Sequence, residues 1–187
     1  VRSISIPVVG DTVPEPDERF FVNLGAPSVA GIAVATAQGS GQIVNDDLGA
    51  DIVVTVDNGA SGLLVGQSTN YAIGIANTSA LIDVAAVGIQ QTISAGLSGA
   101  TWTCTATGTA ICPPNSTGAL ALTRAIPRAS ALQFVTTANV TASGGATVGS
   151  SVTATVQAPN IDPNPANNIA FDNDPVLADD VFANGFE

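Results

Sequence analysis

Apolar and polar residues alternate along several short stretches of the chain. The clearest stretch follows Asp51, where Ile52, Val54 and Val56 fall on one face. A period of two positions is that of a β-strand with one buried face. The same spacing recurs at Tyr71, Ile73 and Ile75, near 82–93, at Trp102 and Cys104, at Leu120 and Leu122, at Leu132, Phe134 and Thr136, and at Val148, Val152, Ala154 and Val156. No window of about 11 residues keeps a helical period.

Turn-forming residues separate these stretches, as Asp57-Asn58-Gly59 does. Roughly seven to nine short strands at such spacing predict an all-β fold, an antiparallel β-sandwich over 49–175. The last of these strands are expected before the Pro-rich segment near 159–165. Residues 176–187 are expected to form an acidic C-terminal tail.

Residues 1–48 predict a separate, smaller unit. Ile4 and Ile6 indicate a short strand that ends at Pro7. Two further strands are predicted at Phe20, Val22 and Leu24, and at Gln42, Ile43 and Val44. So short a piece buries too little apolar area to be stable alone, so we expect it to lean on the second unit or to be poorly ordered in isolation.

Acidic residues cluster at two places in this first unit. Asp11 and Glu15 lie in a loop where prolines exclude a helix, and Asp46 and Asp47 follow the last predicted strand. Clustered carboxylates repel one another unless a hard cation such as calcium, which takes six to eight oxygen ligands, lies among them. These four residues are the candidate calcium ligands; the alternative is solvated acidic turns.

The order of these features resembles the second half of a Calx-beta domain. The matching positions are Asp11, Glu15, Glu18, Phe20, Val22 and Leu24, followed by Gly41, Ile43, Asn45, Asp46 and Asp47. The resemblance implies an immunoglobulin-like sandwich, incomplete at its N-terminus, and calcium at the acidic turn. It departs from the family pattern at Gly10, where calcium-binding relatives can carry Asp.

Residues 51–172 resemble the DUF-eleven repeat of bacterial surface proteins. The motifs are Asp51-Ile-Val-Val-Thr, Gly66…Thr69-Asn-Tyr71…Asn77-Thr78, Trp102-Thr-Cys104…Cys112 and Asp162-Pro-Asn-Pro-Ala-Asn-Asn168. This resemblance implies a second immunoglobulin-like sandwich with no catalytic residues. The ending Asp179-Asp-Val-Phe182…Gly185-Phe-Glu is similar to a short C-terminal motif of secreted proteobacterial proteins.

Charge and composition narrow the function. The chain carries 15 acidic residues against 4 basic ones, a net charge of −11. This argues against nucleic acid and anionic membranes as partners. There is no His and no Lys, which excludes His-dependent triads, His-ligated zinc and Schiff-base chemistry. No apolar run reaches the length of about 18 residues that a membrane span needs.

Cys104 and Cys112 are the two cysteines. Their spacing does not fit a zinc site, and in a secreted β-protein they predict a disulfide that closes a short loop; two free thiols are the alternative. Trp102 is read as core packing or as a sugar platform. Asp162, Asn164, Asn167 and Asn168 are read as turn formers or as calcium ligands.

The sequence therefore predicts a non-catalytic structural or adhesive module of a secreted or cell-surface bacterial protein, stiffened by calcium where two modules join. Its expected partners are a surface protein or polysaccharide and neighbouring repeats of the same chain. The alternative is a carbohydrate-binding or accessory domain of an extracellular hydrolase. In that case Asp11 and Glu15 could form a carboxylate pair.

Overall fold

The computed structural model describes residues 3–10, 17–29, 31, 33–44 and 49–178, and the chain divides into two units, 1–48 and 49–187. Each unit is described by itself. Within the described residues no helix is long and apolar enough to cross a membrane.

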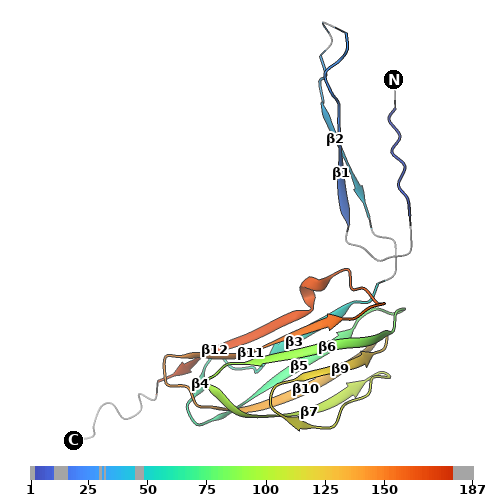
Figure 1. The fold of residues 1–187 in the computed structure, drawn as a ribbon. Helices are drawn as coiled ribbons and strands as arrows, with labels where there is room; N and C mark the ends of the chain where they lie inside the picture. The colour runs from blue at the N-terminus through green and yellow to red at the C-terminus, as the bar shows by residue number, and fades with distance from the viewer. Residues whose placement is uncertain (1–2, 11–16, 30, 32, 45–48, 179–187) are drawn as a thin grey trace, which may run out of the picture. The chain divides into compact units, whose positions relative to one another are not determined.

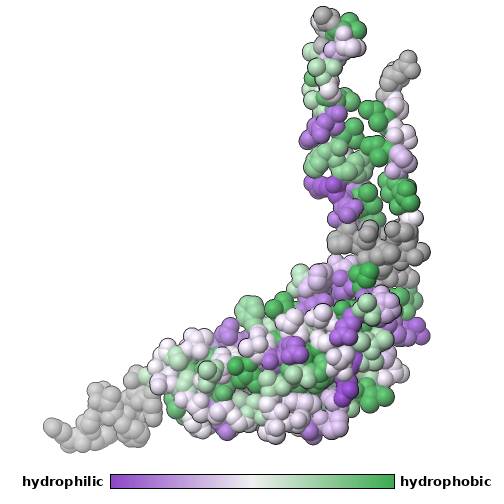
Figure 2. Space-filling model, viewed as in Figure 1, coloured by the Kyte–Doolittle hydropathy of each residue, from purple (hydrophilic) through white to green (hydrophobic). Residues whose placement is uncertain are grey.

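The first unit contains a two-stranded antiparallel sheet of β1 (Glu18–Asn23) and β2 (Gln38–Ile43) (Figure 1). Phe20 faces Gly41 across the pair, and its ring covers the space that a Cβ at Gly41 would occupy. Glycine is needed there because the ring lies directly over the backbone. None of the described residues of this unit is buried, and Figure 2 shows apolar side chains on the hairpin surface.

The strand predicted at Ile4 and Ile6 is wrong. Residues 3–10 form no strand, because no other described segment pairs with them by a hydrogen-bonded ladder. The two isoleucines instead line an open groove with Val22 and Leu24 of the hairpin. Alternation correctly predicts that these side chains share a face, but a strand also requires a neighbouring backbone.

The second unit is a sandwich of two five-stranded sheets, which confirms the predicted all-β fold (Figure 1). The first sheet has the order β3 (Ile52–Asp57), β5 (Ser68–Asn77), β10 (Ser130–Val140), β7 (Leu97–Thr107) and β8 (Ser116–Thr117). The second has the order β4 (Leu63–Leu64), β12 (Ile169–Leu177), β11 (Thr147–Val156), β6 (Val84–Ile93) and β9 (Ala121–Ile126). All pairs are antiparallel except β4 with β12.

One core lies between the two sheets. The predicted inward faces of β3 and β5 are confirmed, since Ile52, Tyr71, Ile73 and Ile75 are each 0% exposed. In β10 the buried residues alternate in the same way, including Leu132 and Phe134. The Trp102 and Phe134 rings meet edge to face, with centroids 5.6 Å apart at 83°, an arrangement that aromatic pairs favour.

The sequence analysis missed the last strand, β12. It extends to Leu177 and lies inside its sheet, between β4 and β11. Its inward positions carry Asp172 and Asp174 before Val176, so polar side chains occupy places where the pattern requires apolar ones. Pro175, which cannot donate to a strand ladder, disguises the strand further.

Candidate functional site

The four candidate calcium ligands of the first unit, Asp11, Glu15, Asp46 and Asp47, all lie outside the described residues. Among the described residues there is no group of three or more acidic, histidine or cysteine side chains that could hold a metal ion. Calcium at the acidic turn therefore stays a prediction.

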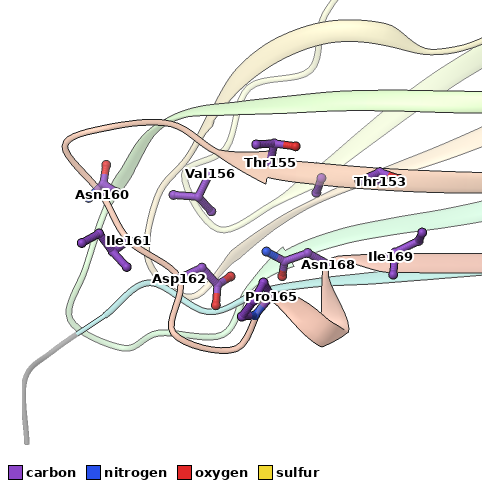
Figure 3. Close-up of a pocket in the computed structure, with 10 residues that line it drawn as sticks. Thr153, Thr155, Val156, Asn160, Ile161, Asp162, Pro165, Asn168 and Ile169 are labelled. Atoms are coloured by element: carbon purple, nitrogen blue, oxygen red, sulfur yellow. The ribbon is translucent and has the colours of Figure 1, made fainter. Parts of the chain in front are cut away.

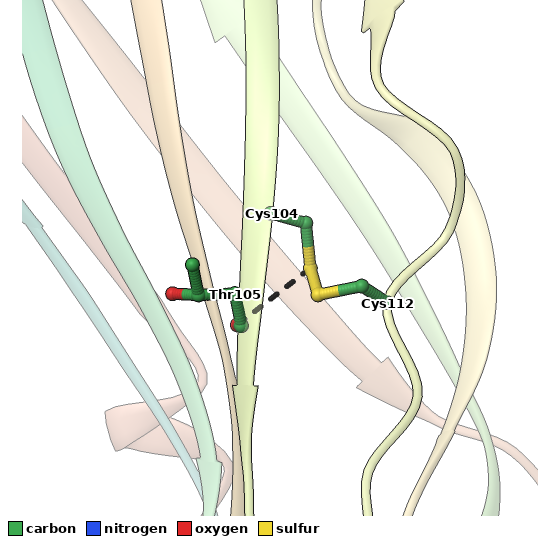
Figure 4. Close-up of a disulfide and its surroundings, with 3 residues drawn as sticks. All are labelled: Cys104, Thr105 and Cys112. Carbon is green, nitrogen blue, oxygen red and sulfur yellow. Dashed lines mark hydrogen bonds between the residues drawn. A yellow bond between two sulfur atoms is a disulfide. The ribbon is translucent and has the colours of Figure 1, made fainter.

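The predicted disulfide between Cys104 and Cys112 is confirmed (Figure 4). The two Cα atoms lie 5.7 Å apart, and the bond ties β7 to the loop that leads into β8. The Thr105 carbonyl oxygen lies 3.7 Å from Cys104 Sγ. An oxidised sulfur has no hydrogen to donate, so this contact is van der Waals in nature.

The two single aromatic residues that could have formed a sugar platform are both inside the core. Trp102 is 7% exposed and Tyr71 is 0% exposed. A flat carbohydrate surface requires aromatic rings that face solvent. The core-packing interpretation of Trp102 is therefore the correct one, and the carbohydrate-binding alternative loses the residues on which it depended.

Where β3 ends, Asn58 connects the first strand of the sandwich to the last. Its backbone N–H donates to Asp172 Oδ2 at 2.7 Å, and its side-chain amide donates to Asp174 Oδ2 at 2.6 Å. The same amide donates to Thr69 Oγ1 at 3.3 Å. Asp174 is only 3% exposed, so these donors are needed to satisfy a carboxylate that has little access to water.

The Tyr71 hydroxyl lies beside this network without a hydrogen bond of its own. Burial raises the pKa of Tyr71 to about 12, with further increases from the Asp174 and Asp172 carboxylates. The nearby Asn58 side chain lowers this pKa, although it makes no hydrogen bond of ordinary geometry to the hydroxyl.

We predict that Tyr71 ionises only when the sandwich opens. A folded-state pKa above the ordinary value of about 10 stabilises the fold fully below that pH, and the contribution is lost as the pH rises toward 12. Tyr71 is the only tyrosine, so phenolate absorbance reports on it alone. Between these two pH values we expect phenolate in denaturant and none in the folded chain; equal titration in both states would contradict the prediction.

Where β3 begins, the segment that precedes β12 is bonded to it. Asp162 Oδ2 accepts the Ile52 N–H at 2.8 Å, and Asp162 Oδ1 accepts the Asn164 N–H at 2.9 Å. Asn167 Nδ2 donates to Asp51 Oδ1 at 2.9 Å. The motif beginning at Asp51 and the motif from Asp162 to Asn168 thus meet, although they are more than 100 residues apart in the sequence.

A pocket of about 520 Å³ opens beside these contacts (Figure 3). Its polar lining includes Asp162, Asn160 and Asn168, and its apolar lining includes Ile161 and Ile169. In Figure 3 the Asp162 carboxyl and the Asn168 amide point toward one another. Two of the four residues that the sequence offered as turn formers or calcium ligands, Asp162 and Asn168, therefore line one cavity.

Comparisons with known proteins support the fold and leave the function open. No protein-family model matches the chain. No curated protein matches it either. The resemblances to the Calx-beta domain and the DUF-eleven repeat therefore remain interpretations of motifs.

Similar solved structures are β-sandwich domains of low sequence identity. The CARDB domain of the PF1109 protein from Pyrococcus furiosus, in complex with di-metal ions, is 16% identical at a TM-score of 0.45, over 71% of this chain and 95% of that one. AvmM, which catalyses macrocyclization in alchivemycin A biosynthesis, is 10% identical at 0.43, over 68% and 89%. The collagen-binding domain of a Staphylococcus aureus adhesin is 9% identical at 0.37, over 66% and 96%. These likenesses concern the fold alone.

Proposed function

We propose that this chain is a non-catalytic structural or adhesive module that carries tension along an extracellular or cell-surface protein. The observation that supports this most is the path of the chain through the second unit. The chain enters the sandwich at one end and leaves it at the other, with the first and last strands side by side (Figure 1). A module of this kind extends a protein by its own length.

The hydrogen bonds define the direction of both strands. The start of β3 is bonded to Asp162, shortly before β12, and the residue after β3 is bonded to Asp172 and Asp174 in the middle of β12. The two strands therefore run in the same direction. The chain next crosses to the second sheet as β4, which pairs in parallel with β12 through Leu63 and Val176.

This arrangement suits a load that acts on the two ends of the unit. Tension would slide β3 and β4 along β12, so the connecting hydrogen bonds would have to break together instead of one after another. The core adds resistance, because its fully buried side chains come from both sheets.

Three further parts of the proposal rest on the sequence. Calcium at Asp11, Glu15, Asp46 and Asp47 would reduce the repulsion among carboxylates and stiffen the connection between modules. The partners would be a surface protein or polysaccharide and neighbouring repeats. The disulfide supports an oxidising, extracellular location.

Force spectroscopy on the full chain tests the proposal. With handles at positions 49 and 178 the load runs along the sandwich, whereas handles at 49 and 160 pull on one end and peel β3 away from the Asp162 segment. We expect a clearly higher rupture force for the first geometry. Equal forces, or a higher force for peeling, would reject a tension-bearing role.

A further inference from the structure

The Asp162 pocket contains buried oxygen atoms that have no donor. Asn168 is 7% exposed, and its side-chain Oδ1 makes no hydrogen bond. The Oδ1 of the neighbouring Asn167 is also buried and without a partner. Leaving a buried acceptor unsatisfied destabilises a fold, so native structures usually supply a donor, a water or an ion at such atoms.

The orientation of these groups is fixed by their other contacts. The Asn168 carbonyl oxygen accepts the Ala154 N–H of β11 at 2.8 Å, which holds its backbone against the sheet. The Asn167 amide nitrogen is bonded to Asp51, so its oxygen must point elsewhere. The unpartnered oxygens thus follow from the packing of this segment.

The charge around the pocket is negative and uncompensated by the described side chains. Asp162 and Asp51 lie at this end of the sandwich, and each already accepts hydrogen bonds from neutral donors. The one salt bridge among the described residues, Arg128 with Asp83, involves neither of them. Each Asp162 oxygen keeps a lone pair beyond the bond it accepts.

We propose that this pocket binds a calcium ion through the Asp162 carboxylate and the Asn168 amide oxygen. Carboxylate and amide oxygens are the ligands that calcium prefers, and the pocket has room for waters to complete the coordination shell. The carboxylate of Asp51 adds negative charge nearby. With so few charged ligands, the affinity falls in the range of extracellular modules, a Kd of roughly 10⁻⁴ to 10⁻³ M.

This site is separate from the calcium site proposed at the acidic turn of the first unit, and it does not depend on that site or on the tension-bearing role. Asp162 also accepts the Ile52 N–H, so a bound ion would strengthen the contact between the start of β3 and the last segment of the sandwich. Calcium would then stabilise the folded state in proportion to its occupancy.

Thermal unfolding of the full chain in calcium chloride tests the proposal. At a concentration about twentyfold above the Kd we expect the Tm to rise by roughly 4–7 °C. Sodium chloride at equal ionic strength controls for screening of the net charge of −11, and magnesium chloride controls for divalent charge. A rise of the same size in all three salts would overturn the proposal.

Three variants locate the ion. Asp162→Asn keeps an acceptor for the Ile52 N–H but removes the charge, so the calcium shift should disappear. Asn168→Asp adds a carboxylate at the same position and volume, so calcium should bind more tightly and shift the Tm further. The double variant Asp46→Ala, Asp47→Ala should keep the shift. A full shift in Asp162→Asn, or its loss only in the double variant, would place the ion elsewhere and overturn the proposal.

Discussion

We expect the double variant Cys104→Ala, Cys112→Ala to lose roughly 2–3 kcal/mol of unfolding free energy. The disulfide joins residues separated by 8 positions, and a crosslink over so short a loop removes a limited but substantial amount of freedom from the unfolded chain. Both cysteines are partly buried and pack against the core. Urea denaturation monitored by the single tryptophan, Trp102, measures the loss.

Chemical reduction of the wild-type chain supplies the control, because it breaks the same bond without changing a side chain. The loop also has a second anchor, the bond from the Thr109 N–H to Ser130 Oγ at 3.0 Å. A loss below about 0.5 kcal/mol in both experiments would mean that this anchor orders the loop by itself and that the crosslink account is wrong.

The variant Asp162→Ala is expected to lose about 1–3 kcal/mol of unfolding free energy. Its carboxylate accepts two backbone N–H groups, those of Ile52 and Asn164. Ile52 is 0% exposed, so its N–H would be left without a partner and with little access to water. A buried donor that loses its acceptor costs more than an exposed one, because water does not replace the bond.

Asp57→Ala is the matched control. Asp57 also accepts a backbone N–H, that of Gly59 at 2.7 Å, but the bond is exposed and spans two positions. We expect a loss well below that of Asp162→Ala, and partial recovery in Asp162→Asn, which keeps one acceptor oxygen. Equal losses at positions 57 and 162 would show that the contact between distant segments contributes nothing special.

The sequence predicted much of the sandwich because its inward residues are apolar and alternate. That signal worked for β3, β5, β7 and β10, where burial follows the period of two. It failed for β12, where Asp172 and Asp174 face inward and are satisfied by Asn58. A buried carboxylate stabilised by a distant amide carries no local signature, so the pattern alone suggested a tail.

The candidate site shows the same limit. The residues from Asp162 to Asn168 are typical of turns, and several do form turns, as the bond from the Asn164 N–H to Asp162 Oδ1 shows. The contact of Asp162 with the Ile52 N–H depends on folding across the whole sandwich. Only the structure shows that Asn168 is buried with an unpartnered oxygen, since sequence spacing does not reveal burial.

The central claim is that the bonds between the first and last strands carry load. The most direct test is the rupture force of the wild-type chain and of Asp162→Ala, both pulled from positions 49 and 178. The account predicts a lower force for Asp162→Ala and an unchanged force for Asp57→Ala. If Asp162→Ala ruptured at the wild-type force while its equilibrium stability fell, the contact would stabilise the fold without bearing tension, and the proposed role would be contradicted.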